Sequence, residues 1–237
     1  MSFEITFPEL PTLARFTRLR RAFGRKTSTL RLMQYEFLES REFSGRLVDI
    51  GGGETAGYRH LLGDRIEYVS VNITDSVRPT HVIKPDELLP LPDAYADHVL
   101  AMNTLEHVYD DIAMMREMCR VAKPGGLVTI SVPFFFRIHA SPMDYHRHTA
   151  DWWGRKLGDM GMEDVTVRPL VWGRHSSTKS QMTGGLSRNL ADLRDIAVAR
   201  IIFGKGLYHG RRGLKAMSLA AGYAVTARRA GAAATDE

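Results

Sequence analysis

The sequence has 237 residues, a length that suits one α/β domain with additions or at most two small domains. Its formal net charge of +5 is too small an excess to indicate nucleic acid as a partner. A single cysteine, Cys119, excludes both a disulfide within the chain and a paired-cysteine metal site, and it fits a reducing, cytoplasmic environment.

Residues 1–42 are expected to form a helical N-terminal extension. The first ten residues include two glutamates and no apolar run, so they do not resemble a secretory signal. Nowhere does an apolar run approach the roughly 20 residues of a membrane-spanning helix. Two helices are predicted by apolar residues at helical spacing, the first ending at Gly24 and the second capped by Ser28 or Thr27: Leu13, Phe16, Leu19 and Phe23, then Leu30, Met33 and Phe37.

Residues 43–171 are the expected core, in which strands and helices alternate. Such alternation favours a parallel sheet with helices on both faces and right-handed crossovers. The clearest helix is predicted over residues 112–121. The predicted strands are 46–50, 68–73, 82–83, 98–102, 127–132 and 165–171.

Residues 172–221 differ in character and are expected to form a helical and loop insertion. Residues 173–185 are rich in Gly, Ser and Thr, which predicts a mobile loop. Residues 204–215 are basic and glycine-rich, residues 222–228 predict a last strand within a final segment 222–237, and residues 230–237 are expected to be disordered. Between the loop and the basic run, residues 186–203 predict an amphipathic helix with one apolar face: Leu186, Leu190, Leu193, Ala197 and Ile201.

A glycine-rich turn, residues 51–53, follows the first core strand. Glycines let the backbone approach a ligand, and open α/β sheets bind ligands at the carboxyl ends of their strands. The acid before the glycines, Asp49, would repel a pyrophosphate but suits a sulfonium ligand that carries an ammonium group. A nicotinamide dinucleotide would still accept Ala56 after the turn, and a tight turn without any ligand is the plainer alternative.

Four motifs occur in a fixed order along the core. They are D-x-G-x-G from Asp49, L-P-L-P-D at residues 89–93, L-E-H-V at residues 105–108 and A-K-P-G-G at residues 122–126. In this order they resemble the class I S-adenosylmethionine (SAM)-dependent methyltransferases, and within them the glycan-associated branch of methyltransferase type 11. The resemblance covers about residues 45–170. It implies a Rossmann-like, mostly parallel sheet of seven strands whose last strand, 222–228, is inserted antiparallel, which makes residues 172–221 an insertion over the site.

The resemblance also implies SAM as the cofactor and a set of residues that bind it. Asn72 stands where an acid commonly accepts hydrogen bonds from both ribose hydroxyls; an Asn accepts one and donates one. Asp86 is nearest to the acid that faces adenine, but it lies one position away. Glu106 matches the L-E-H-V motif, and a simple first-turn helix acid is the alternative for it. The expected cofactor-binding residues are Asp49, Gly51, Gly53, Asn72, Asp86 and Asn103.

Residues 133–149 concentrate histidines after the fifth strand and resemble an H-x-x-P-x-D-Y-x-R-x-T segment of the same branch. A histidine with a pKa near ~6.5 can act as a general base at neutral pH. If the acceptor is a hydroxyl, His146 is the first candidate base and His139 the second, with Asp144 orienting the imidazole. A metal site from these residues and His148 is conceivable, but no metal is expected, because the family does not need one.

These observations predict a SAM-dependent methyltransferase that acts on a small-molecule or glycan acceptor, by O-methylation. The alternatives are a SAM-binding regulatory or scaffold protein without catalysis, and an NAD-dependent oxidoreductase, against which Asp49 argues. No nucleic-acid partner is expected, since no N-P-P-Y-like motif occurs. Residues 173–215 are expected to form either a lid or an arm in peripheral contact with a membrane, or else a core helix with a solvated basic loop.

Overall fold

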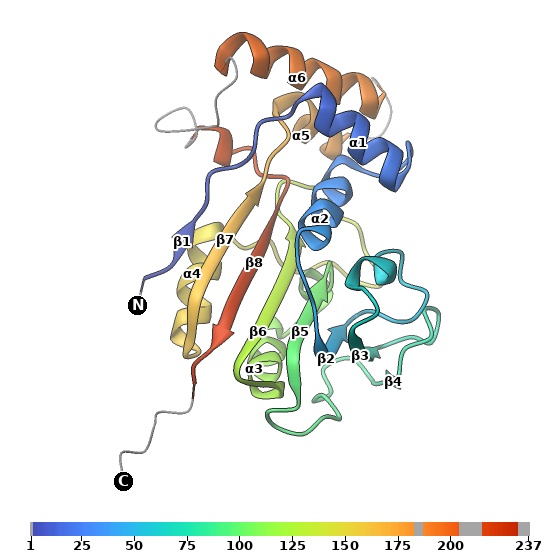
Figure 1. The fold of residues 1–237 in the computed structure, drawn as a ribbon, viewed down its shortest axis with the longest axis vertical. Helices are drawn as coiled ribbons and strands as arrows, with labels where there is room; N and C mark the ends of the chain where they lie inside the picture. Colours follow the sequence, from blue (N-terminus) through green and yellow to red (C-terminus); the bar gives the residue numbers. More distant parts are fainter. Residues whose placement is uncertain (1, 183–186, 204–214, 232–237) are drawn as a thin grey trace.

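The computed structural model describes residues 2–182, 187–203 and 215–231 (Figure 1). Its strands form one mixed sheet of eight, in the order β1-β7-β8-β6-β5-β2-β3-β4. All neighbouring strands pair in parallel except β8, which is antiparallel to both β6 and β7. The strands are β1 Glu4–Ile5, β2 Gly45–Ile50, β3 Ile66–Asn72, β4 His81–Val82, β5 Ala96–Met102, β6 Ala122–Pro133, β7 Met162–Leu170 and β8 Gly222–Arg229.

Helices cover both faces of the sheet, as the alternation of strands and helices predicts. Side chains alternate along each strand, so neighbouring residues pack on opposite faces. On β5, Val99 belongs to the same core cluster as Met115 of α3 and Trp153 of α4, whereas Leu100 belongs to the cluster that includes Leu38 of α2. The helices are α1 Leu13–Phe23, α2 Thr29–Glu39, α3 Asp111–Val121, α4 Ala150–Asp159, α5 Arg174–Gln181 and α6 Arg188–Phe203, with short 3-10 turns η1 Arg59–Leu62 and η2 Leu105–His107.

The expected count of seven strands is wrong by one. The additional strand is β1, which pairs in parallel with the edge strand β7 through Glu4 and Thr166. A strand of two residues is too short to show any periodicity, so the sequence does not predict it. The N-terminal segment is expected to be helical, and the structure shows that it also contains this strand. The antiparallel insertion of β8 between β6 and β7 is confirmed.

Both predicted N-terminal helices are confirmed, together with their caps. The side chain of Ser28 accepts a hydrogen bond from the backbone N–H of Arg31 at the start of α2. Gly24 ends α1 with a φ of 90°, a conformation that a residue with a Cβ rarely adopts. The predicted core strands and the helix over residues 112–121 are present within three residues of their expected bounds, except that the strand expected at 127–132 begins five residues earlier, at Ala122.

The mobile loop expected over residues 173–185 is wrong for most of that range, because residues 174–181 form helix α5. Asp195 of α6 caps α5: its carboxylate accepts hydrogen bonds from the backbone N–H groups of His175 (2.9 Å) and Ser176 (2.8 Å). No residue near α5 in the sequence supplies this cap, so a local pattern does not show it. Residues 183–186 lie outside the described residues.

The predicted helix over residues 186–203 is present as α6, which begins at Arg188 in the described part of the chain. Most of the basic run 204–215 and the expected disordered end, from residue 232, lie outside the described residues. Among the helices that the structure describes, none is both long and apolar enough to cross a membrane.

Candidate active site

Three adjacent parallel strands bring the predicted cofactor residues to one edge of the sheet. The glycine turn follows β2, which pairs with β3 on one side and β5 on the other. Asn72 ends β3, and Asn103 follows β5 directly. Because the carboxyl ends of parallel strands meet at the same edge, these residues lie around one point of the fold. Asp86 is exposed in the loop after β4, which pairs in parallel with β3 at Asn72 and Val82.

The glycine turn is enclosed by the protein on both sides. Gly51 has a φ of 83°, and a Cβ placed on it would lie 2.2 Å from Oγ1 of Thr104. A Cβ on Gly53 would lie 2.2 Å from the carbonyl oxygen of Val77, in the segment after β3. Both distances are far below van der Waals contact, so only glycine fits at these two positions.

Asp49 lies beneath this turn and is fully buried. Its carboxylate accepts hydrogen bonds from the hydroxyls of Tyr58 (3.0 Å) and Tyr68 (2.7 Å). Burial raises the pKa of Asp49 to about 6, although the two tyrosine hydrogen bonds lower it. Asp49 is therefore mostly ionised at neutral pH, and it holds a negative charge directly under the turn.

The two asparagines at the strand ends shape the site. The amide nitrogen of Asn72 donates to the carbonyl oxygens of Gly51 (2.8 Å) and Gly52 (3.2 Å), so this side chain fixes the turn. Asn103 has a φ of 51° and exchanges hydrogen bonds of 2.6 Å and 3.1 Å with Gln34 of α2. The buried Gln34, like the two tyrosines below the turn, is a site residue that the sequence does not mark.

The loop between β6 and α4 holds His139 beside a charged pair. The backbone N–H of His139 donates to Oδ2 of Asp144 (2.8 Å), and its Nδ1 lies 3.3 Å from the same oxygen. Arg147 donates to both oxygens of Asp144. Burial lowers the pKa of His139, against the opposing effect of the Asp144 charge. A neutral imidazole thus lies beside the carboxylate of Asp144, which Arg147 in turn holds in place.

Glu106, at the start of the L-E-H-V helix turn η2, is the most unusual ionisable group here. Its side chain is 2% exposed, and neither of its carboxylate oxygens accepts a hydrogen bond from another described residue. Burial raises its pKa to about 8. Nε2 of His107 lies 3.6 Å from Oε1 of Glu106, and the rings of His107 and His139 are 5.1 Å apart. Glu106, His107 and His139 therefore form one continuous group.

His146 belongs to a different group from His139. Its Nε2 lies 2.9 Å from the carbonyl oxygen of Tyr109, and its ring stacks on His148 at 5.3 Å. Nε2 of His148 lies 2.6 Å from Oδ2 of the buried Asp111. The sequence allows His139, His146 and His148 as ligands of one metal site. In the described chain His139 instead groups with Glu106 and His107, whereas His146 and His148 group with Asp111.

Comparisons with known proteins bear on the fold and on the stretch that includes the glycine turn. Residues 48–130 match the family model described as a methyltransferase domain. A chain in the complex between the Haloferax volcanii Trm112 methyltransferase activator and a methyltransferase aligns with a TM-score of 0.54 at 15% identity, covering 92% of this chain and 95% of that one. This protein has a methyltransferase fold. Phosphoethanolamine N-methyltransferase 2 of Haemonchus contortus, solved with phosphomonomethylethanolamine and S-adenosylhomocysteine, shares it with a TM-score of 0.52 at 13% identity over 90% of this chain and 56% of that chain.

The similarity in sequence to curated proteins is confined to part of each chain. The ubiquinone/menaquinone biosynthesis C-methyltransferase UbiE of Shewanella sp. (strain W3-18-1) is 32% identical over 103 residues. The aligned stretch covers 36% of this chain and 41% of that protein. The chain thus spans about two-fifths of the length of the curated relatives it matches.

Proposed function

We propose that this chain is a SAM-dependent methyltransferase that acts on a small-molecule or glycan acceptor. The observation that carries the proposal is the enclosed glycine turn at the carboxyl edge of the sheet, above a buried carboxylate, within the stretch that matches the methyltransferase domain. The names of the curated relatives support a small-molecule acceptor, because they describe methyltransferases of ubiquinone and menaquinone biosynthesis.

The chemistry of the turn fits SAM better than a dinucleotide. When bound, SAM supplies an electrophilic methyl group on a sulfonium. The negative charge of Asp49 under the turn complements that sulfonium and the adjacent ammonium, whereas it opposes a pyrophosphate. Residues 51–53 would hold the methionine part of the cofactor. Asn72 would face the ribose with less hydrogen-bonding capacity than an acid, because its amide nitrogen already binds the turn and its Oδ1 already accepts a hydrogen bond from the backbone N–H of Ile73 (2.8 Å).

For a hydroxyl acceptor, His139 is the proposed general base, ahead of His146. Its lowered pKa keeps His139 neutral at pH 7, and the Asp144–Arg147 pair orients its ring. The acceptor oxygen would form the new bond to the methyl carbon as the bond from that carbon to sulfur breaks and S-adenosylhomocysteine leaves, and the hydroxyl proton would move to the imidazole. His146 uses its Nε2 on the carbonyl of Tyr109, and His139 holds its Nδ1 beside Asp144, so each ring has one nitrogen left for such a role.

The test is release of S-adenosylhomocysteine from SAM in the presence of hydroxylated quinols, catechols and sugars. His139→Gln is expected to lower turnover by roughly 100- to 10,000-fold, the usual effect of losing a general base, with SAM affinity unchanged within about threefold. His60→Gln, at an exposed position on η1, is the matched control and should leave turnover unchanged. Turnover within about threefold of wild type in both His139→Gln and His146→Gln would exclude both as the base. SAM binding without release of product from any acceptor would favour the scaffold alternative.

A further inference from the structure

Helix α6 packs against the protein with the side that holds its two acids together with Ala191, Ile196 and Ala199, and its outward side exposes several large apolar residues. Asp192 and Asp195, its only acidic residues, are 1% and 3% exposed. In contrast, Ile201 is 83% exposed, and the other large apolar residues of the outward side are exposed as well. The predicted apolar face of this helix is therefore correct in composition, but it does not face the core. Among the side chains of α6 that the structure describes, the exposed ones are Leu190, Leu193, Arg194, Ala197, Val198, Arg200 and Ile201.

Buried polar contacts account for this orientation. Asp192 accepts hydrogen bonds from Nη2 of the buried Arg20 (2.5 Å) and from the hydroxyl of Thr29 (2.8 Å). Asp195 caps α5 through two backbone N–H groups and also accepts a hydrogen bond from the hydroxyl of Ser176. A surface helix normally buries its apolar stripe. Here ion-pair and cap contacts hold the opposite side, and they leave the apolar stripe without a covering element among the described residues.

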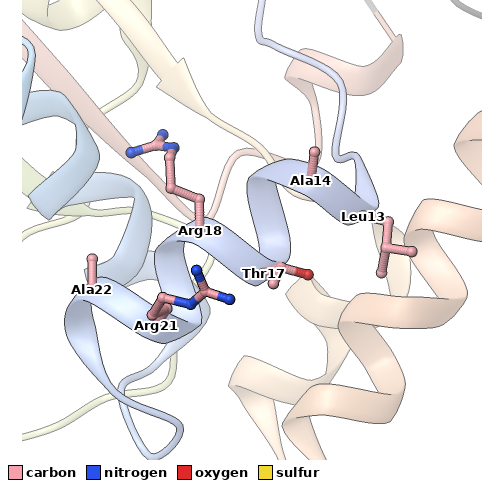
Figure 2. A pocket seen from close by; sticks show the side chains of 6 residues that line it. All are labelled: Leu13, Ala14, Thr17, Arg18, Arg21 and Ala22. Carbon is pink, nitrogen blue, oxygen red and sulfur yellow. The ribbon is translucent and has the colours of Figure 1, made fainter.

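Helix α1 lies beside α6 and extends the same kind of surface (Figure 1). A pocket of about 670 Å³ runs along α1, and Figure 2 shows its described lining on successive turns: Leu13, Ala14, Thr17, Arg18, Arg21 and Ala22. Residues 13–23 include no acid, and Leu13 is 59% exposed. We call the outward residues of both helices the α1–α6 surface. The charge of Arg18 is neutralised by Glu36 and Glu39. The positive charge of the α1–α6 surface therefore resides on Arg21, Arg194 and Arg200.

We propose that the α1–α6 surface docks on an anionic membrane. Apolar side chains flanked by arginines, with no acid on the outward residues of either helix, are the composition of an interfacial amphipathic helix. The apolar side chains enter the boundary of the acyl chains, while the arginines extend to lipid phosphates. A bilayer is favoured over a folded partner because the described outward residues of both helices that carry an unpaired charge, Arg21, Arg194 and Arg200, are all positive. The proposal is independent of the proposed methyl transfer.

Vesicle flotation tests this proposal with the full chain. The wild-type protein is expected to float with vesicles of equal parts phosphatidylcholine and phosphatidylglycerol, and not with phosphatidylcholine alone. High salt should weaken the binding, because each arginine near an anionic surface contributes roughly fivefold to the binding constant. The double variant Leu193→Asp/Ile201→Asp is expected to lose at least about tenfold in binding, since it removes apolar insertion and adds negative charge.

The matched control is Leu88→Asp, which places the same charge at a leucine that is 72% exposed in a loop away from these helices. It should bind vesicles like the wild type, and thermal unfolding should be alike for all variants because every substituted side chain is exposed. The proposal is overturned if the wild type does not float with anionic vesicles, or if the double variant floats equally well. A dimer seen by light scattering that the double variant abolishes would instead assign the surface to a second copy of the chain.

Discussion

Glu106 should make the protein less stable as the pH rises through neutrality. Its carboxylate is buried without a hydrogen bond from another described residue, and its pKa is raised from 4.5 to about 8. Between these two values the folded state keeps a proton that the unfolded state has released. The contribution of Glu106 to stability is therefore greatest below pH 4.5 and falls until the pH reaches the raised pKa. Glu106→Gln keeps the shape of the side chain and removes its ionisation.

The size of the effect follows from the shift. One pKa unit corresponds to about 1.4 kcal/mol of unfolding free energy. At pH 7, which is about 2.5 units above the usual value, Glu106→Gln should be more stable than the wild type by about 3 kcal/mol, and at pH 5 by less than about 1 kcal/mol. For a chain of this length, 3 kcal/mol corresponds to a rise in Tm of roughly 6–12 °C.

The assay is thermal unfolding, followed by circular dichroism at several pH values from 5 to 8. The difference in Tm between Glu106→Gln and the wild type should grow steadily with pH. Glu163→Gln, at an exposed carboxylate on β7, is the control and should show no such growth. A gain that is equal at pH 5 and pH 8, or a loss of stability at both, would refute the reasoning that burial keeps Glu106 protonated.

Three further outcomes are expected. Asp192→Ala should lower the free energy of unfolding by about 3–5 kcal/mol in a denaturant titration, because it leaves the buried charge of Arg20 unpaired; a loss below about 1 kcal/mol would contradict this. Gly53→Ala should weaken binding of S-adenosylhomocysteine at least tenfold by calorimetry, since its Cβ would lie 2.2 Å from the carbonyl oxygen of Val77 and displace the turn; unchanged affinity would count against it. The rate of product release should persist below pH 6.5 and fall only at more acidic pH, because burial lowers the pKa of His139; a fall centred above pH 6.5 would exclude His139 as the base.

The parts of the fold that the sequence predicts depend on local signals. The apolar spacing of α1 and α2, the cap at Ser28 and the stop at Gly24 lie within the segments they define. The parts that it misses depend on distant partners. Helix α5 is capped by Asp195 from another helix, and α6 is oriented by Asp192, whose partner Arg20 is 172 residues away along the chain. Periodicity shows that a helix is amphipathic, but it does not show which side faces the protein.

The candidate site likewise has features that the sequence predicts and features that it misses. Strand-end positions such as Gly51, Asn72 and Asn103 can be placed together from the order of parallel strands alone. The environment of a side chain cannot be predicted from the order of the strands, because it depends on how loops fold back. Glu106 is desolvated by residues of the loop after β6, and that loop separates His139 from His146 by contacts with residues near η2 and α3. Whether these residues bind cofactor or acceptor stays a prediction.

Calorimetric titration of the purified protein with SAM, S-adenosylhomocysteine and NAD tests the central claim most directly. The negative charge of Asp49 beneath the glycine turn favours the sulfonium ligand and disfavours the pyrophosphate. SAM and S-adenosylhomocysteine are therefore expected to bind at one site per chain, and NAD to give no saturable heat. Tight binding of NAD together with no binding of SAM would contradict the account.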